Sequence, residues 1–81
     1  MSFNESTFKK LGFRPKKGEK GILRASAEVA RNEFITIDLI ISSGEVSFAG
    51  MEIDGPKANE IRKEYLNEYS LEEINKLFTD Y

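Results

Sequence analysis

The chain has 81 residues and contains neither Cys nor His, which excludes disulfides, thiolate metal sites and imidazole catalysis. Its formal net charge of −2 conceals an uneven distribution, because residues 1–31 carry eight bases and three acids whereas residues 32–81 carry four bases and eleven acids. Such asymmetry favours a charged macromolecular partner over a small substrate.

The N-terminal segment predicts a short helix. Either an N-cap at Asn4 or a capping box formed by Ser2 and Glu5 would start it. Gly12 would end it, because glycine adopts the left-handed conformation after a helix without strain. The next residue, Phe13, would then fold back onto the apolar side of the helix.

The segment that follows, residues 14–21, combines four cationic side chains with Pro15, Gly18 and Gly21. Proline and glycine disfavour regular structure. We therefore expect an exposed and flexible loop in this part of the chain.

Apolar residues then alternate with polar ones, which predicts two strands over residues 23–29 and 34–41. The inward positions of both strands are odd-numbered, so opposed residues must have numbers that sum to an even value. A three-residue loop centred on Asn32 satisfies this condition. It would place Val29 opposite Ile35.

A third strand follows a turn formed by Ser43 and Gly44. Its first inward residue is even-numbered, so we expect Ile41 to lie opposite Val46. At Gly50 the apolar positions change from even to odd, which predicts a β-bulge there. The three strands would form an antiparallel meander.

Two helices complete the chain. Pro56 suits the first turn of a helix whose apolar stripe continues to Tyr69. Ser70 and Glu73 form a capping box for a second helix over residues 71–78. The predicted fold is α+β, in the order α-β-β-β-α-α: a three-stranded antiparallel β-meander with a short N-terminal helix and two C-terminal helices on one face, in a single domain over residues 1–81.

Six bases lie close together at the end of the first helix and in the predicted loop. They could contact a protein partner or a phosphate backbone, and the simpler interpretation is a solvated loop whose lysines offset the helix dipole. The candidate partner-binding residues of this basic segment are Lys9, Lys10, Arg14, Lys16, Lys17 and Lys20.

Acidic residues dominate the two C-terminal helices. They form either a solvated helical face or a surface that binds a basic partner, for example by imitating a nucleic acid. The candidate residues of these acidic helices are Glu60, Glu64, Glu68, Glu72 and Glu73.

The element order α-β-β-β-α over residues 3–69 resembles that of double-stranded-RNA-binding domains. That family uses Lys residues at the start of its second helix to reach phosphates across a groove. The resemblance implies nucleic-acid binding, with a phosphate-contacting role for Lys57, Arg62 and Lys63.

Together these patterns predict a non-enzymatic module that binds a macromolecule, and we favour a protein partner over nucleic acid. An accessory protein of a phage or mobile element that inhibits or modulates a host factor would have these properties. No apolar run approaches the roughly 20 residues of a membrane span, so we expect a cytoplasmic protein without a membrane partner. The two open edges of the sheet leave a homodimer as open as a monomer. We expect no cofactor, metal site or catalytic residue, and a small-molecule enzyme remains a third alternative.

Overall fold

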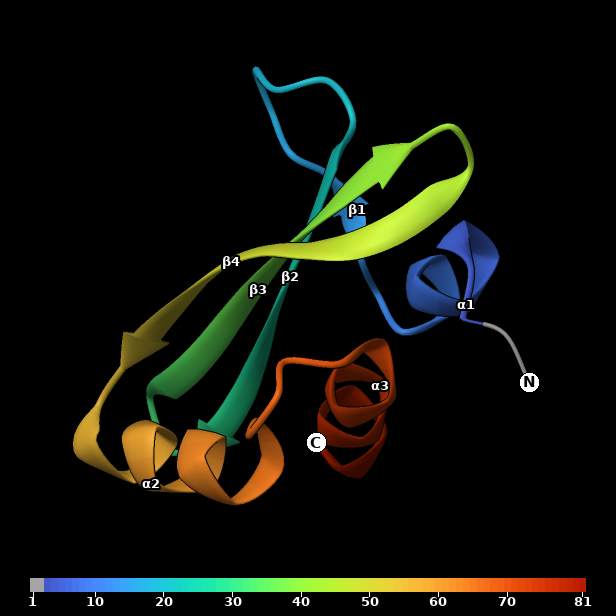
Figure 1. The fold of residues 1–81 in the computed structure, drawn as a ribbon. Coiled ribbons are helices and arrows are strands. Elements are labelled where there is room, and N and C mark those ends of the chain that lie inside the picture. The colour runs from blue at the N-terminus through green and yellow to red at the C-terminus, as the bar shows by residue number, and fades with distance from the viewer. Residues whose placement is uncertain (1–2) are drawn as a thin grey trace.

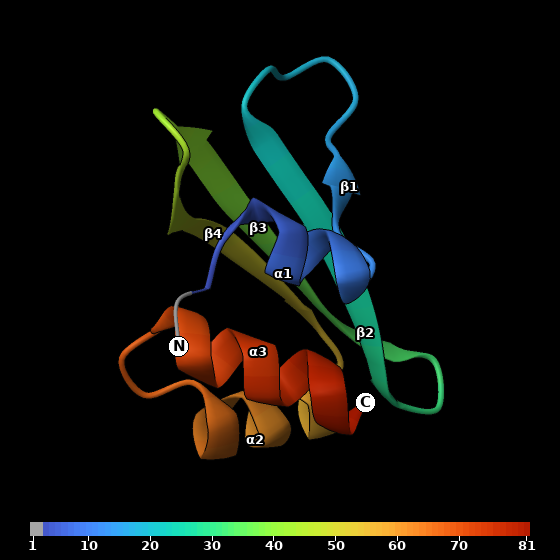
Figure 2. The same cartoon turned by 90° about the vertical axis from the view of Figure 1, so that its right-hand side faces the viewer.

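The computed structural model describes residues 3–81, in which three helices pack on one face of a four-stranded antiparallel sheet (Figures 1 and 2). Ser2 of the alternative capping box lies outside these residues. The strands are adjacent in chain order, β1-β2-β3-β4. The elements are α1 (Glu5–Lys10), β1 (Arg14–Pro15), β2 (Ile22–Ala30), β3 (Glu33–Ser42), β4 (Glu45–Asp54), α2 (Pro56–Tyr65) and α3 (Leu71–Asp80). The α+β class and the antiparallel sheet are confirmed, whereas the prediction of three strands is wrong by one.

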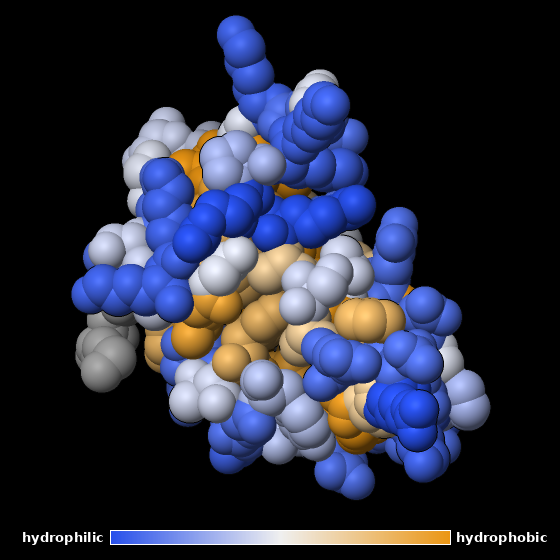
Figure 3. All heavy atoms as spheres, turned by 180° about the vertical axis from the view of Figure 1, so that it is seen from behind, coloured by the Kyte–Doolittle hydropathy of each residue, from blue (hydrophilic) through white to orange (hydrophobic). Residues whose placement is uncertain are grey.

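The additional strand, β1, lies within the segment that we expected to be a loop. It pairs with Leu23 and Arg24 of β2, and the Lys16 N–H donates to the Ile22 carbonyl at 2.8 Å. Two paired residues are too few for alternation to show in the sequence, and Pro15 is tolerated because β1 is an edge strand. In the view from behind, strongly hydrophilic side chains gather over this hairpin, above a band of apolar surface (Figure 3).

Both ends of α1 form as predicted. The Asn4 Oδ1 atom accepts a hydrogen bond from the Thr7 N–H at 3.0 Å, and Thr7 Oγ1 accepts one from the Asn4 N–H at 3.2 Å. Gly12 adopts a φ of 106°. The Phe13 N–H therefore reaches the Phe8 carbonyl at 3.0 Å, and the two rings meet edge to face with centroids 5.5 Å apart.

The register between β2 and β3 differs from the prediction by two residues. Ala27, rather than Val29, lies opposite Ile35. The turn contains two residues instead of three, with Asn32 in the left-handed conformation (φ 58°). A β-bulge at Val29 adds one residue to β2. Beyond the bulge, paired residues again have numbers that sum to an even value, so the apolar residues of both strands share the buried face. The predicted parity was right, but the loop length was wrong because a bulge replaced the third loop residue.

The register between β3 and β4 agrees with the prediction. Ile41 lies opposite Val46 across the two-residue turn. The predicted bulge is present, with Ala49 as the unpaired residue immediately before Gly50. The inward side chains of β4 therefore stay on the buried face along the whole strand.

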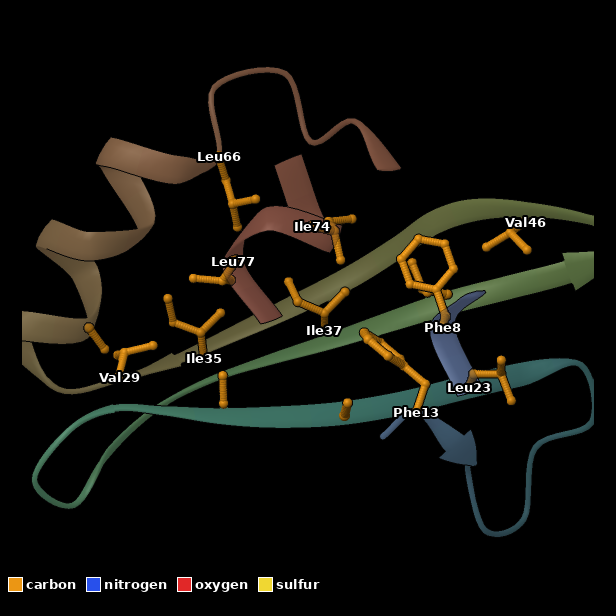
Figure 4. Packing of buried hydrophobic residues seen from close by; sticks show 14 residues of the cluster. Phe8, Phe13, Leu23, Val29, Ile35, Ile37, Val46, Leu66, Ile74 and Leu77 are labelled. Atoms are coloured by element: carbon orange, nitrogen blue, oxygen red, sulfur yellow. The ribbon is translucent and has the colours of Figure 1, made fainter. Parts of the chain in front are cut away.

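The core lies between the inner face of the sheet and the three helices (Figure 4). Phe13 also contacts Phe78 of α3, with ring centroids 4.8 Å apart, so α1 and α3 are joined through aromatic rings. The largest fully buried side chains are Phe8, Phe13, Ile35, Ile37, Leu39, Ile74 and Leu77.

α2 begins at Pro56 as predicted but ends four residues earlier than Tyr69. Leu66 leaves the helix with an extended backbone (φ −113°, ψ 91°) and enters the core, so the apolar stripe was not a continuous helical face. Tyr69 instead packs on Phe48 of β4, with ring centroids 5.0 Å apart. α3 begins after the predicted capping box at Ser70. None of the helices described within residues 3–81 is long and apolar enough to cross a membrane.

Candidate binding surfaces

The six bases of the basic segment lie on α1, β1 and the β1–β2 loop, away from α2 (Figure 1). They differ in how they are paired. Lys9 forms an ion pair with Glu5 at 2.7 Å within α1. Across residues 3–81, the bases of this segment that have no ion-pair or hydrogen-bond partner for the side chain are Lys10, Lys17 and Lys20.

Arg14 connects α1 to the sheet. Its Nη1 atom donates hydrogen bonds to the carbonyls of Lys9, at 2.9 Å, and Phe13, at 2.8 Å. These carbonyls lie at and beyond the C-terminus of α1, where a cation is favourable because the helix dipole is negative there. Part of the Arg14 guanidinium therefore stabilises the fold and is not free for a partner.

Arg24 and Asp38 form a cross-strand pair on the outer face of the sheet. Arg24 Nε and Nη2 donate to the two carboxylate oxygens of Asp38 at 2.6 and 2.9 Å. Lys16 Nζ lies 3.6 Å from the same carboxylate, which ties the β1–β2 hairpin to β3. The hydrogen bonds from Arg24 outweigh desolvation and hold the pKa of Asp38 below its usual value. The two hydrogen bonds make this ion pair bidentate.

The acidic residues of α2 and α3 also divide into two kinds. Glu73 lies in the first turn of α3, and its carboxylate accepts hydrogen bonds from the backbone N–H groups of Asn67, Glu68 and Ser70 in the α2–α3 connection, at 3.0 to 3.1 Å. Desolvation opposes its charged form, but these N–H groups prevail and lower the pKa of Glu73. Glu73 therefore holds the connection together. The exposed acids of this surface are Glu60, Glu64, Glu68 and Glu72.

A shallow hollow lies between α2 and α3. We call it the acidic hollow, and its lining residues are Glu64, Tyr65, Glu72, Glu73 and Lys76. The Tyr65 hydroxyl donates to Asp80 Oδ2 at 2.7 Å, which with desolvation raises the pKa of Tyr65 to about 12. Lys76 Nζ lies 3.5 Å from the same Asp80 carboxylate and 5.9 Å from the centroid of the Tyr65 ring.

The only base that lines the acidic hollow is therefore already paired outside it, with Asp80. Glu64 and Glu72 have no ion-pair partner within the described part of the chain. The structure thus brings two unpaired carboxylates to one opening that has an aromatic ring in its wall.

The three cations that the double-stranded-RNA resemblance singles out lie on α2, at the opposite end of the sheet from the β1–β2 loop (Figures 1 and 2). Arg62 Nη2 donates to Asn59 within the helix at 2.8 Å, whereas Lys57 and Lys63 are exposed. The structure therefore separates these cations from the basic segment. They do not form one continuous basic surface with it.

Sequence reasoning missed the residue that caps α2. Glu33 Oε1 accepts hydrogen bonds from the N–H groups of Lys57, at 2.7 Å, and Ala58, at 3.0 Å. The carboxylate comes from the first residue of β3, distant in sequence from the helix. No local pattern could reveal a contact between residues so far apart in the chain.

The described residues contain no group of three or more acidic side chains that could hold a metal ion. Comparison with known proteins found no matching family model, curated protein or solved structure. Functional inference therefore rests on the two charged surfaces themselves.

Proposed function

We propose that this protein is a non-enzymatic module that binds another protein, and that the acidic hollow receives a basic region of that partner. The observation that carries this proposal is that the carboxylates of Glu64 and Glu72 have no ion-pair partner within the described residues. Both border the same opening, and neither is neutralised by Lys76, which pairs with Asp80.

A Lys or Arg side chain of a partner would find two carboxylates in one place, beside the edge of the Tyr65 ring. Carboxylates attract the cation, and the apolar ring packs against the methylene groups of its side chain. The surrounding acids Glu60 and Glu68 would raise the rate of encounter with a basic surface, because complementary potentials steer association.

The biological setting that we propose is the cytoplasm of a bacterial cell. A small acidic accessory protein of a phage or mobile element could there inhibit or modulate a host factor through its basic surface. The support for this setting is the combination of small size and an unneutralised acidic surface.

Capture from a bacterial lysate on the immobilised protein tests the proposal. A double variant, E64K/E72K, should lose the retained partner, since it reverses the charge of the acidic hollow. The matched control is E19K/E28K, which makes the same charge change on exposed residues of the β1–β2 loop and β2 and should retain the partner. Equal retention by both variants would reject the acidic hollow as the binding surface.

Nucleic-acid binding through the basic segment is the second candidate, favoured by the unpaired side chains of Lys10, Lys17 and Lys20. Three phosphate contacts would make log K fall with log salt at a slope of about −3. Glutamate substitutions at these three lysines should abolish that slope. Failure of the unmodified protein to bind DNA or RNA at low ionic strength would eliminate this candidate.

A further inference from the structure

The two edges of the sheet differ in length and in the residues that protect them. β1 contains two residues, of which one is Pro15, and Arg14 and Lys16 add positive charge. Proline and cations are common devices that keep an edge strand from pairing with another chain. β4, at the other edge, extends over ten residues without Pro, Lys or Arg. It is therefore the less protected edge.

The backbone of β4 directs polar groups away from the sheet. The Ile41 N–H donates to the Gly21 carbonyl at 2.7 Å, on the β2 side, so Ile41 does not bond to Val46 opposite it. The side of the strand toward which a residue directs its N–H and C=O alternates along an antiparallel strand. The odd-numbered residues of β3 therefore bond to β2, like Ile41. The β4 residues opposite them direct their N–H and C=O groups toward the open edge. These residues are Val46, Phe48, Met51 and Ile53.

No helix crosses this edge in either ribbon view, because the helices lie on the inner face and at the lower end of the sheet (Figures 1 and 2). Phe48, Met51 and Ile53 are only half-buried. The apolar row of the inner face therefore extends to the open edge, where the side chains of an added strand could continue it.

The outer face of the same edge is acidic. Glu45, Glu52 and Asp54 are exposed, and no ion-pair partner for them lies within residues 3–81. Neutral residues of β3 lie opposite all three. These residues are Ser42, Thr36 and Phe34.

A second copy of β4 fits this edge poorly. Antiparallel pairing across a two-fold axis would bring together two strands that each carry three acids and no base, and opposed like charges destabilise a sheet. The basic segment of a second copy is already paired through β1 and is interrupted by Pro15. A separate strand that carries Lys or Arg on its outer face would match the acids of β4.

We propose that the open edge of β4 binds an extended segment of a partner protein as a fifth strand, and that this segment alternates Lys or Arg with apolar residues. Main-chain hydrogen bonds would supply affinity, and the alternating side chains would supply specificity. The inference rests on the proposed function only in taking a protein as the partner, since it names a surface different from the acidic hollow.

A synthetic peptide of about eight alternating Lys and Val residues, a usual strand length, is the probe. Added to isotope-labelled protein, it should shift the NMR signals of β4 and slow the hydrogen exchange of the Val46 and Phe48 amides. The same peptide with N-methyl groups on alternate residues keeps its charge but cannot donate hydrogen bonds along one edge. Equal binding of the two peptides would overturn the proposal.

The variant E52K/D54K should weaken binding of the Lys–Val peptide by about tenfold, since it reverses two charges on the outer face. The control variant, E19K/E28K, makes the same charge change outside both proposed binding surfaces and should bind the peptide as tightly as the unmodified protein. Equal weakening in both variants, or unchanged binding by E52K/D54K, would contradict the proposal. If the peptide does not bind the β4 edge, capture of a partner through the acidic hollow can still succeed, so the two proposals are tested separately.

Discussion

Glu33 and Gly55 lie in direct contact at the start of α2, where the Glu33 side chain occupies the space that a Cβ atom on residue 55 would fill. The contact lets the Glu33 carboxylate accept hydrogen bonds from the first N–H groups of the helix. Those groups have no partner within the helix, so the start of β3 and the start of α2 stabilise each other.

Gly55→Ala should therefore lower the free energy of unfolding by about 2–3 kcal/mol, because residue 55 has a φ of 117° and a ψ of 152°, a region that only glycine adopts freely. Urea denaturation measures this loss. Gly18→Ala is the control, since Gly18 also has a positive φ (84°) but open space around it, and it should cost about 1 kcal/mol. Similar losses in the two variants would show that the Glu33 contact contributes nothing.

Asp38→Asn should destabilise the protein by about 1 kcal/mol at neutral pH, since it removes a bidentate hydrogen-bonded ion pair that is partly screened by solvent. The pKa of Asp38 is lower in the folded state than in the unfolded state. Its stabilisation is therefore fully present above the unfolded pKa, about 3.9, and is lost as pH falls through the folded pKa.

Unfolding of the wild type and the Asp38→Asn variant should be compared across this pH range. The difference in unfolding free energy should stay constant from about pH 5 to 8 and shrink below about pH 4. A difference that grows on acidification would contradict the assigned direction of the pKa shift.

The sequence predicted the elements whose signals are local. The caps at Asn4 and Ser70, the turn after β3 and the bulge beside Gly50 all follow from residues a few positions apart. The odd or even numbering of the inward residues then determined the β3–β4 register, because the two-residue turn and the change in apolar positions at Gly50 were both visible in the sequence.

Features that depend on distant contacts or compensating irregularities could not be predicted. The bulge at Val29 does not interrupt the alternation of apolar and polar residues in β2, so the sequence gives no sign of it. A three-residue loop and a two-residue turn with a bulge both place the apolar residues of β2 and β3 on one face. β1 is too short for a periodic signal. Among the site residues, exposure of the helix acids was predictable, and the capping box predicted the bond from the Ser70 N–H to Glu73. The bonds from Asn67 and Glu68 to Glu73 depend on the non-helical path of the chain after Tyr65.

Glu73→Ala should loosen the α2–α3 connection, since it leaves the N–H groups of Asn67, Glu68 and Ser70 without their acceptor. We expect a loss of about 1 kcal/mol in unfolding free energy, typical of a lost cap, and faster hydrogen exchange at these three amides. Glu72→Ala is the neighbouring control and should leave these exchange rates unchanged. Slow exchange in both variants would contradict the assigned role.

Tyr65 should ionise at about pH 12 because its hydroxyl donates to Asp80 and is desolvated. An ultraviolet titration of the phenol groups measures this, with Tyr65→Phe identifying the signal. Asp80→Asn removes the negative charge beside the hydroxyl and should bring the pKa of Tyr65 toward the ordinary value of about 10. An unchanged titration in Asp80→Asn would show that Asp80 is not the partner in solution.

The most direct test of binding through the acidic hollow is carbodiimide cross-linking of the captured complex, followed by mass spectrometry. This reagent joins a carboxylate to a lysine that contacts it, so it reports which charged side chains lie at the interface. We predict links from Glu64 or Glu72 to lysines of the partner. Links formed only through Lys10, Lys17 or Lys20 to acids of the partner would contradict the proposal and assign the interface to the basic segment.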